Sequence, residues 1–274
     1  MRVADLAIHT ISTHHPSLDE ALDGYAAAGF RRVEVSLREV KGWLDGRPPS
    51  AFAGALDDRG LRCVGGLESV LQCFADEESR RANLELHVGN ARLLHELGGG
   101  VLTVGTDGPE QRSVEALDQI AARFRELAAA IEGLDVRVAL EFNWSPIVKS
   151  LDSAYRVVAA VDHPQVGILF DPAHYRTTMT KFEDLTPDRT GRVVHVHLND
   201  MRDIPADLSD CNADRVLPGE GVLDLPVLIG ALEAGGYGGS YSIEMFNRDL
   251  WELPAAETAR RCYRSLLPLC VDGQ

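Results

Sequence analysis

The segment VGILFDPAHY, residues 166–175, combines a short apolar run with two polar side chains placed where that run ends. The run VGILF has the apolar, partly β-branched composition of a buried strand. Asp171 follows it directly, before Pro172, and His174 comes three residues later. The pattern predicts a strand with a carboxylate and an imidazole at its carboxyl end.

Similar short runs recur evenly along the chain. Each is followed by a segment whose apolar residues have helical spacing, which is the pattern of βα units, and we count eight such units. The predicted strands are VADLAIH from Val3, RRVEVS from Arg31, LRCVGG from Leu61, GVLTVG from Gly100, VRVALEF from Val136, VGILFD from Val166, RVVHVHL from Arg192 and SYSIEMF from Ser240.

The segments between these strands predict helices, several of which begin near Asp, Ser or Pro, while the first two end in Gly. The sixth unit is the weakest, because residues 181–189 form a short segment that contains Pro187. The other predicted helices span residues 17–29, 49–60, 76–97, 109–132, 151–161, 225–234 and 254–267.

Eight βα units in 274 residues predict a (β/α)8 TIM barrel, whose usual size is about 250 residues. An open dinucleotide-binding sheet fits less well, because no GxGxxG follows the first strand and the glycines 98–100 precede a strand. No linker divides the chain, so we expect one domain over residues 1–274. Residues 201–221 are too long and polar for a minimal turn and are expected to form a loop over the active face.

Charge and composition limit the partners of this chain. The chain has 27 Lys and Arg residues and 42 Asp and Glu residues, and the resulting net charge of −15 disfavours binding to nucleic acid. The start MRVADLAIHT has no signal-peptide pattern, and no later run is long and apolar enough to cross a membrane, so we expect a cytoplasmic protein without a membrane partner. The cysteines form no CxxC pair and are expected to be structural thiols: Cys63, Cys73, Cys211, Cys262 and Cys270.

Four neighbouring predicted strands end in polar residues, which would meet at one mouth of the barrel. Charges gathered there are costly unless a cation compensates them. Three carboxylates with one imidazole suit an octahedral ion, for which Mn²⁺ is favoured over Mg²⁺ and Co²⁺. The predicted ligands are Glu141, Asp171, His197 and Glu244.

Each of these residues has a structural alternative. Glu141 or Glu244 alone fits an ion pair, Asp171 fits the start of a turn, and His197 fits a core histidine with satisfied hydrogen bonds. Their occurrence on consecutive strands favours the metal interpretation.

The order Glu, Asp-x-x-His, His, Glu at these strand ends resembles the sugar phosphate isomerase/epimerase family of xylose isomerase-like barrels. The segments LDEALDGYAAAGFRRVEV, HVHLND, LPGEGVLDL and IEMFNRDLW are also similar to that family. The resemblance implies that Glu141, Asp171, His197 and Glu244 bind a divalent metal. It further implies that His174 and Arg202 contact substrate oxygens, whereas a turn-capping histidine and a solvated loop arginine are the alternatives.

Such a site suits chemistry at a carbon beside a carbonyl. A metal held by a carbonyl and its neighbouring hydroxyl stabilises an enediolate, and Glu141 and Glu244 fit the base and the acid of an isomerase or epimerase. Loss of a hydroxyl from the same intermediate would give a dehydratase of an inosose or of 3-dehydroshikimate, and the sequence leaves both open. We expect an unphosphorylated keto-sugar or cyclic polyol as substrate and, by resemblance, a homo-oligomer.

Other strand-end residues are candidates for the pocket. We expect His9, Glu34 and Trp144 to bind substrate, although His9 and Glu34 also fit packing in the barrel mouth, and Glu68 is left open. Two further aromatic residues are expected to exclude water from the pocket, namely Phe246, which also fits core packing, and Trp251. His195 is expected to face the helices, away from His197.

Two rival functions fit less well. An endonuclease acting at abasic DNA sites shares this barrel but needs further histidines, where this chain has VGGLES and VGTDG, and a basic groove. A non-catalytic barrel subunit is the other rival, and the intact ligand set speaks against it.

Overall fold

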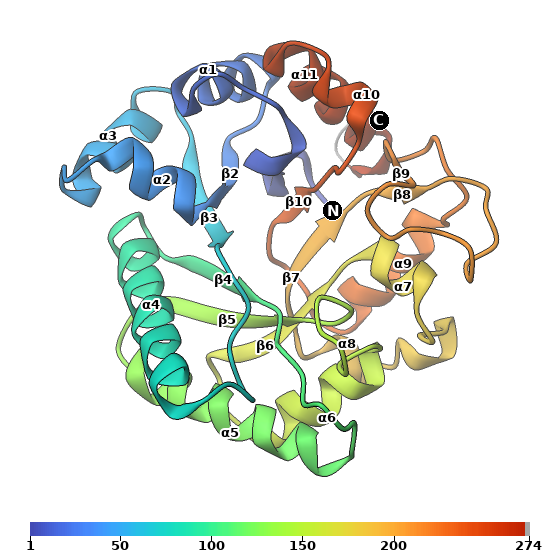
Figure 1. Cartoon of the computed structure of the whole chain (residues 1–274). Helices are drawn as coiled ribbons and strands as arrows, with labels where there is room; N and C mark the ends of the chain where they lie inside the picture. The colour runs from blue at the N-terminus through green and yellow to red at the C-terminus, as the bar shows by residue number, and fades with distance from the viewer. Residues whose placement is uncertain (272–274) are drawn as a thin grey trace.

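Eight parallel strands close into a barrel in the computed structural model, which describes residues 1–271 (Figure 1). Neighbouring strands follow the order β1-β10-β7-β6-β5-β4-β3-β2, so the last barrel strand pairs with the first. The predicted (β/α)8 barrel is confirmed. The barrel strands are β1 (Leu6–His9), β2 (Arg32–Ser36), β3 (Arg62–Leu67), β4 (Gly100–Val104), β5 (Val136–Glu141), β6 (Val166–Phe170), β7 (Val193–Leu198) and β10 (Tyr241–Ile243).

Helices surround the barrel and bury its outer face (Figure 1). The first is capped as its sequence predicts, because Ser17 accepts a hydrogen bond from the Glu20 backbone and Gly29 ends the helix at a φ of 116°. No helix in the described residues is long and apolar enough to cross a membrane. The α-helices are α1 (Leu18–Ala28), α2 (Leu37–Leu44), α3 (Pro49–Asp57), α4 (Glu77–Glu96), α5 (Glu115–Ala130), α6 (Leu151–Val161), α7 (Pro172–Thr177), α8 (Pro187–Thr190), α9 (Leu225–Ala234), α10 (Arg248–Trp251) and α11 (Ala255–Leu266).

Three local structures differ from the sequence prediction. The first strand begins at Leu6, because Val3–Asp5 form a 3-10 turn in which Asp5 accepts from the Arg2 backbone. The last barrel strand ends at Ile243 rather than at residue 246, since the Met245 backbone donates to the Ser12 hydroxyl instead of a strand. The weak sixth crossover breaks into α7, a 3-10 turn over Phe182–Asp184 and α8.

The inside of the barrel is apolar at one level and polar above it. Val101, Ala139 and Leu169 pack together inside the barrel and are separate from the large core between strands and helices. Charged side chains, including Glu34 and His197, lie inside the barrel with no exposure to solvent. Groups buried in this way need partners, so their contacts determine what this end of the barrel can do.

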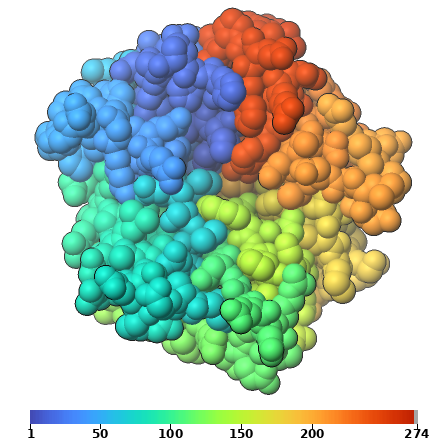
Figure 2. Space-filling view, viewed as in Figure 1, coloured from blue at the N-terminus to red at the C-terminus, as the bar shows by residue number. Residues whose placement is uncertain are grey.

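Residues 201–221 are organised by a small hairpin beside the mouth. Strand β8 (Asp200–Met201) pairs antiparallel with β9 (Arg215–Val216), and in Figure 2 the orange residues of this region border the centre of the face. The buried Asp200 carboxylate accepts hydrogen bonds from the backbone of Gly219, Gly221 and Leu223, at 3.0–3.1 Å. This carboxylate ties the end of the segment to the barrel.

Candidate metal and active site

Four buried side chains converge at the carboxyl ends of neighbouring strands. Glu141 is the last residue of β5, Asp171 follows β6, His197 lies in β7 and Glu244 follows β10. One ligand atom from each lies within 4.8 Å of the others. The structure therefore brings together the four residues that the sequence suggested as metal ligands.

The imidazole of His197 is at the centre of this cluster. Its Nδ1 lies 3.2 Å from Glu244 Oε2, 3.6 Å from Asp171 Oδ2 and 3.7 Å from Glu141 Oε1. Within residues 1–271 this buried nitrogen has no hydrogen-bond partner, which would be costly without a further ligand. Ligand atoms about 2.0–2.2 Å from one ion lie near this far apart, so the cluster fits a divalent cation.

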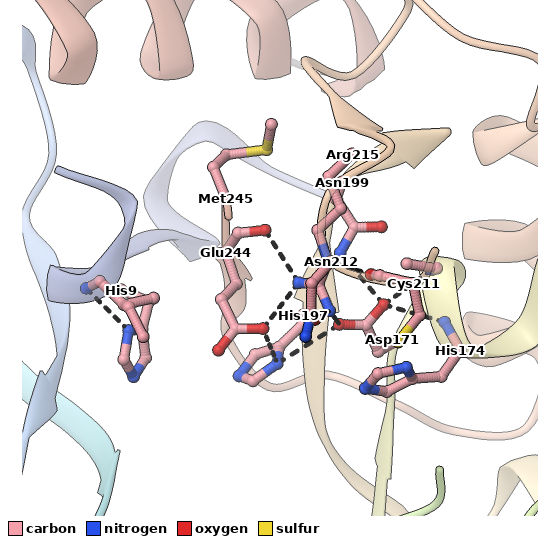
Figure 3. A network of polar contacts seen from close by, with 12 residues as sticks. His9, Asp171, His174, His197, Asn199, Cys211, Asn212, Arg215, Glu244 and Met245 are labelled. Atoms are coloured by element: carbon pink, nitrogen blue, oxygen red, sulfur yellow. Dashed lines mark hydrogen bonds and ion pairs between the residues drawn. The ribbon is translucent and has the colours of Figure 1, made fainter. Parts of the chain in front are cut away.

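Asp171 is oriented by contacts to its other oxygen. Its Oδ1 accepts hydrogen bonds from the Ala173 backbone at 2.7 Å and from the Asn199 amide at 3.0 Å. Asp171 is thereby the N-cap of α7, which explains the Asp-Pro sequence at this point. These bonds leave Oδ2 directed at His197, as Figure 3 shows.

A buried arginine offsets part of the negative charge of the cluster. Arg215 Nη1 lies 2.7 Å from Glu244 Oε2, and its Nη2 lies 3.1 Å from Asp171 Oδ2 (Figure 3). The guanidinium also lies 5.0 Å from the centre of the Phe246 ring, and its Nε donates to the Cys211 carbonyl at 2.7 Å. Sequence analysis missed Arg215, because it belongs to the long segment 201–221 rather than to a strand end.

The charges shift the pKa values of the site. Burial raises the pKa of Glu244, but His197 and Arg215 outweigh this effect and lower it to about 2. Burial lowers the pKa of His174, but the Asp171 carboxylate and contacts with Cys211 and Glu141 raise it to about 10. His174 Nε2 lies 3.1 Å from Glu141 Oε1, so a charged imidazole faces this carboxylate. The cluster therefore offers an ionised carboxylate and a protonated imidazole at neutral pH.

A cavity of about 320 Å³ opens onto these side chains. Apolar groups cover part of it, and Trp144 lies among them, as the sequence predicted. Its volume is in the range of sites for small molecules. The residues that line it are Ile11, Leu67, Glu141, Asn143, Trp144, His174, Cys211, Asn212, Arg215, Glu244 and Phe246.

Comparison with known families identifies the barrel. The model of a family described as "Xylose isomerase-like TIM barrel" matches residues 22–266, which is most of the chain. This chain belongs to the xylose isomerase-like TIM barrel family. The resemblance drawn from the strand-end residues is thereby confirmed.

Curated relatives of this family member are enzymes of two kinds. The chain is 33% identical over 138 residues to an inosose isomerase of Bacillus velezensis, a match that covers 49% of both chains. It is 29% identical over 266 residues to a 3-dehydroshikimate dehydratase of Pseudomonas aeruginosa, a match that covers 92% of this chain and 40% of the relative. The chain spans about half the length, or less, of these curated relatives.

Solved structures share the fold of this xylose isomerase-like barrel. The structure of an IOLI protein with a bound zinc atom has a TM-score of 0.87 at 22% identity, and the match covers 98% of this chain and 99% of that chain. A xylose isomerase domain protein from Alicyclobacillus acidocaldarius has a TM-score of 0.82 at 26% identity, with coverage of 98% and 99%.

Three residues expected to bind substrate lie outside the cavity of this family member. Arg202 is exposed and lines separate recesses beside α10 and α11, because the chain turns outward directly after β8. His9 ends β1 and Glu34 lies in β2, and both side chains are completely buried and do not line the cavity. None of these three residues lines the cavity, and Arg215 is the arginine that does.

The aromatic and acidic candidates near the mouth have different positions. Phe246 lines the cavity, whereas Trp251 stacks on His14 and lines a neighbouring recess. Glu68 forms an ion pair with Lys41 and does not line the cavity. Of the two aromatic residues near the last strand, Phe246 alone borders the site directly.

His195 faces the barrel interior, so the prediction that it faces the helices is wrong. Side chains alternate along a strand, and residues two apart therefore share a face. His195 and His197 both lie inside the barrel, where their rings are 5.4 Å apart and each contacts Glu34.

Proposed function

We propose that this chain is a divalent-metal-dependent enzyme that isomerises or epimerises a keto-sugar or cyclic keto-polyol. The observation that carries this proposal is the convergence of three carboxylates and one imidazole beside a small cavity, which two of them, Glu141 and Glu244, line. The inosose isomerases and the dehydratases among the relatives support chemistry of this general type.

Glu141, Asp171, His197 and Glu244 would hold the metal. Mn²⁺ fits three carboxylates and one imidazole well, and Mg²⁺ and Co²⁺ are alternatives. Zinc is a further alternative, because the structure of the IOLI protein contains a bound zinc atom. A bound divalent ion supplies Lewis acidity, which makes the carbon beside a substrate carbonyl more acidic.

Two glutamates are placed to move the proton. Glu244 is ionised because of its low pKa, and its Oε2 accepts a hydrogen bond from Arg215 Nη1 at 2.7 Å. Its Oε1 is therefore the oxygen that we assign to removal of the carbon-bound proton. Glu141, whose Oε1 lies 3.7 Å from His197 Nδ1, would return a proton to the second face or to the neighbouring carbon.

Cationic groups would stabilise the enediolate oxygens. Arg215 and His174 line the cavity beside the two glutamates, and both are positively charged at neutral pH. Trp144 and Phe246 cover the cavity with apolar surface and exclude water, which strengthens these electrostatic contacts.

The cavity favours a substrate without its own charge. Arg215 is the one arginine or lysine among its lining residues, and its guanidinium is already paired with two carboxylates. His174 is the other cationic group that lines it, and this imidazole is already paired with Glu141 at 3.1 Å. We therefore propose an unphosphorylated polyol ketone.

A dehydratase is the second candidate, and two observations favour it. The match to a 3-dehydroshikimate dehydratase extends over 92% of this chain. His174, with its pKa of about 10, is a charged acid that can donate a proton to a departing hydroxyl. After proton removal, elimination then competes with reprotonation.

The test is an NMR assay in D₂O on ketohexoses, inososes and 3-dehydroshikimate, with the metal chelated before spectra are recorded. Deuterium beside the carbonyl together with an isomeric product supports the isomerase or epimerase. A vinylic signal with loss of water supports the dehydratase. Glu244→Gln keeps the shape of the side chain and removes the base, so it should abolish exchange, and full exchange by this variant would refute the mechanism.

A further inference from the structure

A fourth carboxylate, outside the ligand cluster, contacts His197 on the edge of the ring opposite to the cluster. Glu34 is on β2 and has no exposure to solvent. Its Oε2 is 3.2 Å and its Oε1 is 3.3 Å from His197 Nε2, the ring nitrogen that does not face the other carboxylates. His195 Nε2 lies 2.8 Å from the same Oε2.

We propose that Glu34 is a positioning residue that holds the imidazole of His197 in the tautomer and orientation required for metal binding. This inference rests on the proposed function, because it concerns the same metal site. Glu34 does not line the cavity, so it would act on the metal only through His197.

The tautomer follows from the partners of the two ring nitrogens. An ionised carboxylate only accepts hydrogen bonds, so His197 Nε2 must carry the proton that it donates to Glu34. In the neutral ring Nδ1 then has a free lone pair, and this nitrogen faces the oxygens of Glu141, Asp171 and Glu244. The contact with Glu34 thus selects Nδ1 as the metal ligand.

The orientation of the ring follows from the contacts on both sides. Glu34 is itself held by two donors, since His195 and His197 both contact its Oε2. The rings of His195 and His9 lie edge to face with that of His197, at centroid distances of 5.4 and 6.0 Å. The ring of His197 is therefore enclosed below the metal cluster, and rotation would break its hydrogen bond to Glu34.

A second metal ion is the competing explanation for this trio. Ligand atoms of Glu34, His195 and His197 also lie within 4.8 Å of one another. Hydrogen bonds of 2.8–3.3 Å account for these contacts without an ion. The number of metal ions bound per chain distinguishes the two explanations.

The test measures Co²⁺ binding to chelator-stripped protein by competition with a metallochromic dye, together with the visible absorption of bound Co²⁺. We expect the parent protein to bind one Co²⁺ ion per chain. Glu34→Gln should bind Co²⁺ about 10–100-fold more weakly than the parent, and the visible spectrum of the bound ion should change. Glu39→Gln is the control, because Glu39 lies on α2, contacts His15 and Thr10 and is outside the cluster. It should bind Co²⁺ like the parent.

A double-mutant cycle separates positioning from general structural damage. In a His197→Asn background, Glu34→Gln should cause no further loss of Co²⁺ affinity, since the residue through which it acts is gone. An equal loss in both backgrounds would overturn the proposal. Unchanged affinity of the single variant, or two ions per parent chain, would also overturn it.

The parent protein offers a readout that needs no variant. In the zinc-loaded protein, long-range ¹H–¹⁵N NMR spectra should find His197 protonated at Nε2 and not at Nδ1, and the reverse tautomer would refute the proposal even if Glu34→Gln fails to fold. Absence of any metal binding by the parent would overturn the proposed function, and this inference with it. Normal metal binding by the parent that is unchanged in Glu34→Gln would overturn this inference alone.

Discussion

Replacement of Arg215 by methionine tests the electrostatics of the site most directly. Arg215 is almost completely buried and forms ion pairs with Asp171 and Glu244, at 3.1 and 2.7 Å. Methionine fills much of the same volume but supplies no charge. In metal-free protein the change leaves two buried carboxylates without their cation.

The expected loss is large in the absence of metal. Removal of one partner from a buried ion pair costs about 3–5 kcal/mol. At 2–4 °C per kcal/mol, the midpoint of thermal unfolding should fall by roughly 6–20 °C. A divalent cation should restore more stability to Arg215→Met than to the parent, because the guanidinium no longer opposes its binding.

The assay is urea or thermal unfolding with excess chelator and again with excess Mn²⁺. Arg202→Met is the matched control, since Arg202 belongs to the same segment but is exposed, and it should change stability by less than about 0.5 kcal/mol. If metal-free Arg215→Met lay within about 1 kcal/mol of the parent and matched the control, our account of the site would be refuted.

Three further predictions concern pH, packing and metal. Contact with Glu39 raises the pKa of His15 above 6.5. The parent should therefore be more stable than His15→Gln below pH 6.5, and this difference should disappear as the pH rises through the raised pKa. Equal differences in unfolding free energy between the two proteins at pH 6 and pH 9, measured by urea titration, would contradict this. Gly221→Ala should cost about 1–3 kcal/mol in thermal unfolding, because its Cβ would lie 2.3 Å from Asp200 Oδ1, whereas Gly42→Ala on open helix surface should cost nothing. Turnover should vanish on chelation and return with Mn²⁺, Co²⁺ or Mg²⁺, and turnover that survives metal removal would contradict the enediolate mechanism.

The parts of the site on strand ends were predictable from sequence. In a parallel barrel the carboxyl ends of all strands meet at one mouth, so Glu141, Asp171, His197 and Glu244 are neighbours whatever the exact strand lengths. Asp171 illustrates this most clearly, because its local role as a helix cap fixes where its free oxygen points.

The depth of a residue within the barrel was harder to predict. Alternation correctly places His9 and Glu34 on the inside, but their level relative to the mouth depends on strand register and tilt. The error for His195 was different, because its spacing of two from His197 already implies a shared face.

Arg215 lies beyond sequence prediction for a physical reason. Its side chain reaches the cluster only because the hairpin β8–β9 folds over the mouth and the Asp200 carboxylate holds the returning chain. Both contacts join residues more than ten positions apart within an irregular segment, which no local periodicity encodes. Arg202, nearer to the strand end, is exposed and does not line the cavity.

The Asp200 carboxylate binds the backbone of residues 219–223, which fixes both ends of the segment 201–221 and makes this segment a suitable target for redesign. The segment supplies three of the residues that line the cavity, Cys211, Asn212 and Arg215, yet none of the four metal-ligand candidates. A designer can therefore vary Cys211 and Asn212 to reshape the cavity while the four metal-ligand candidates stay on the strands. Any segment grafted in place of residues 201–221 would have to keep an arginine at the position of Arg215, because this side chain pairs with Asp171 and Glu244.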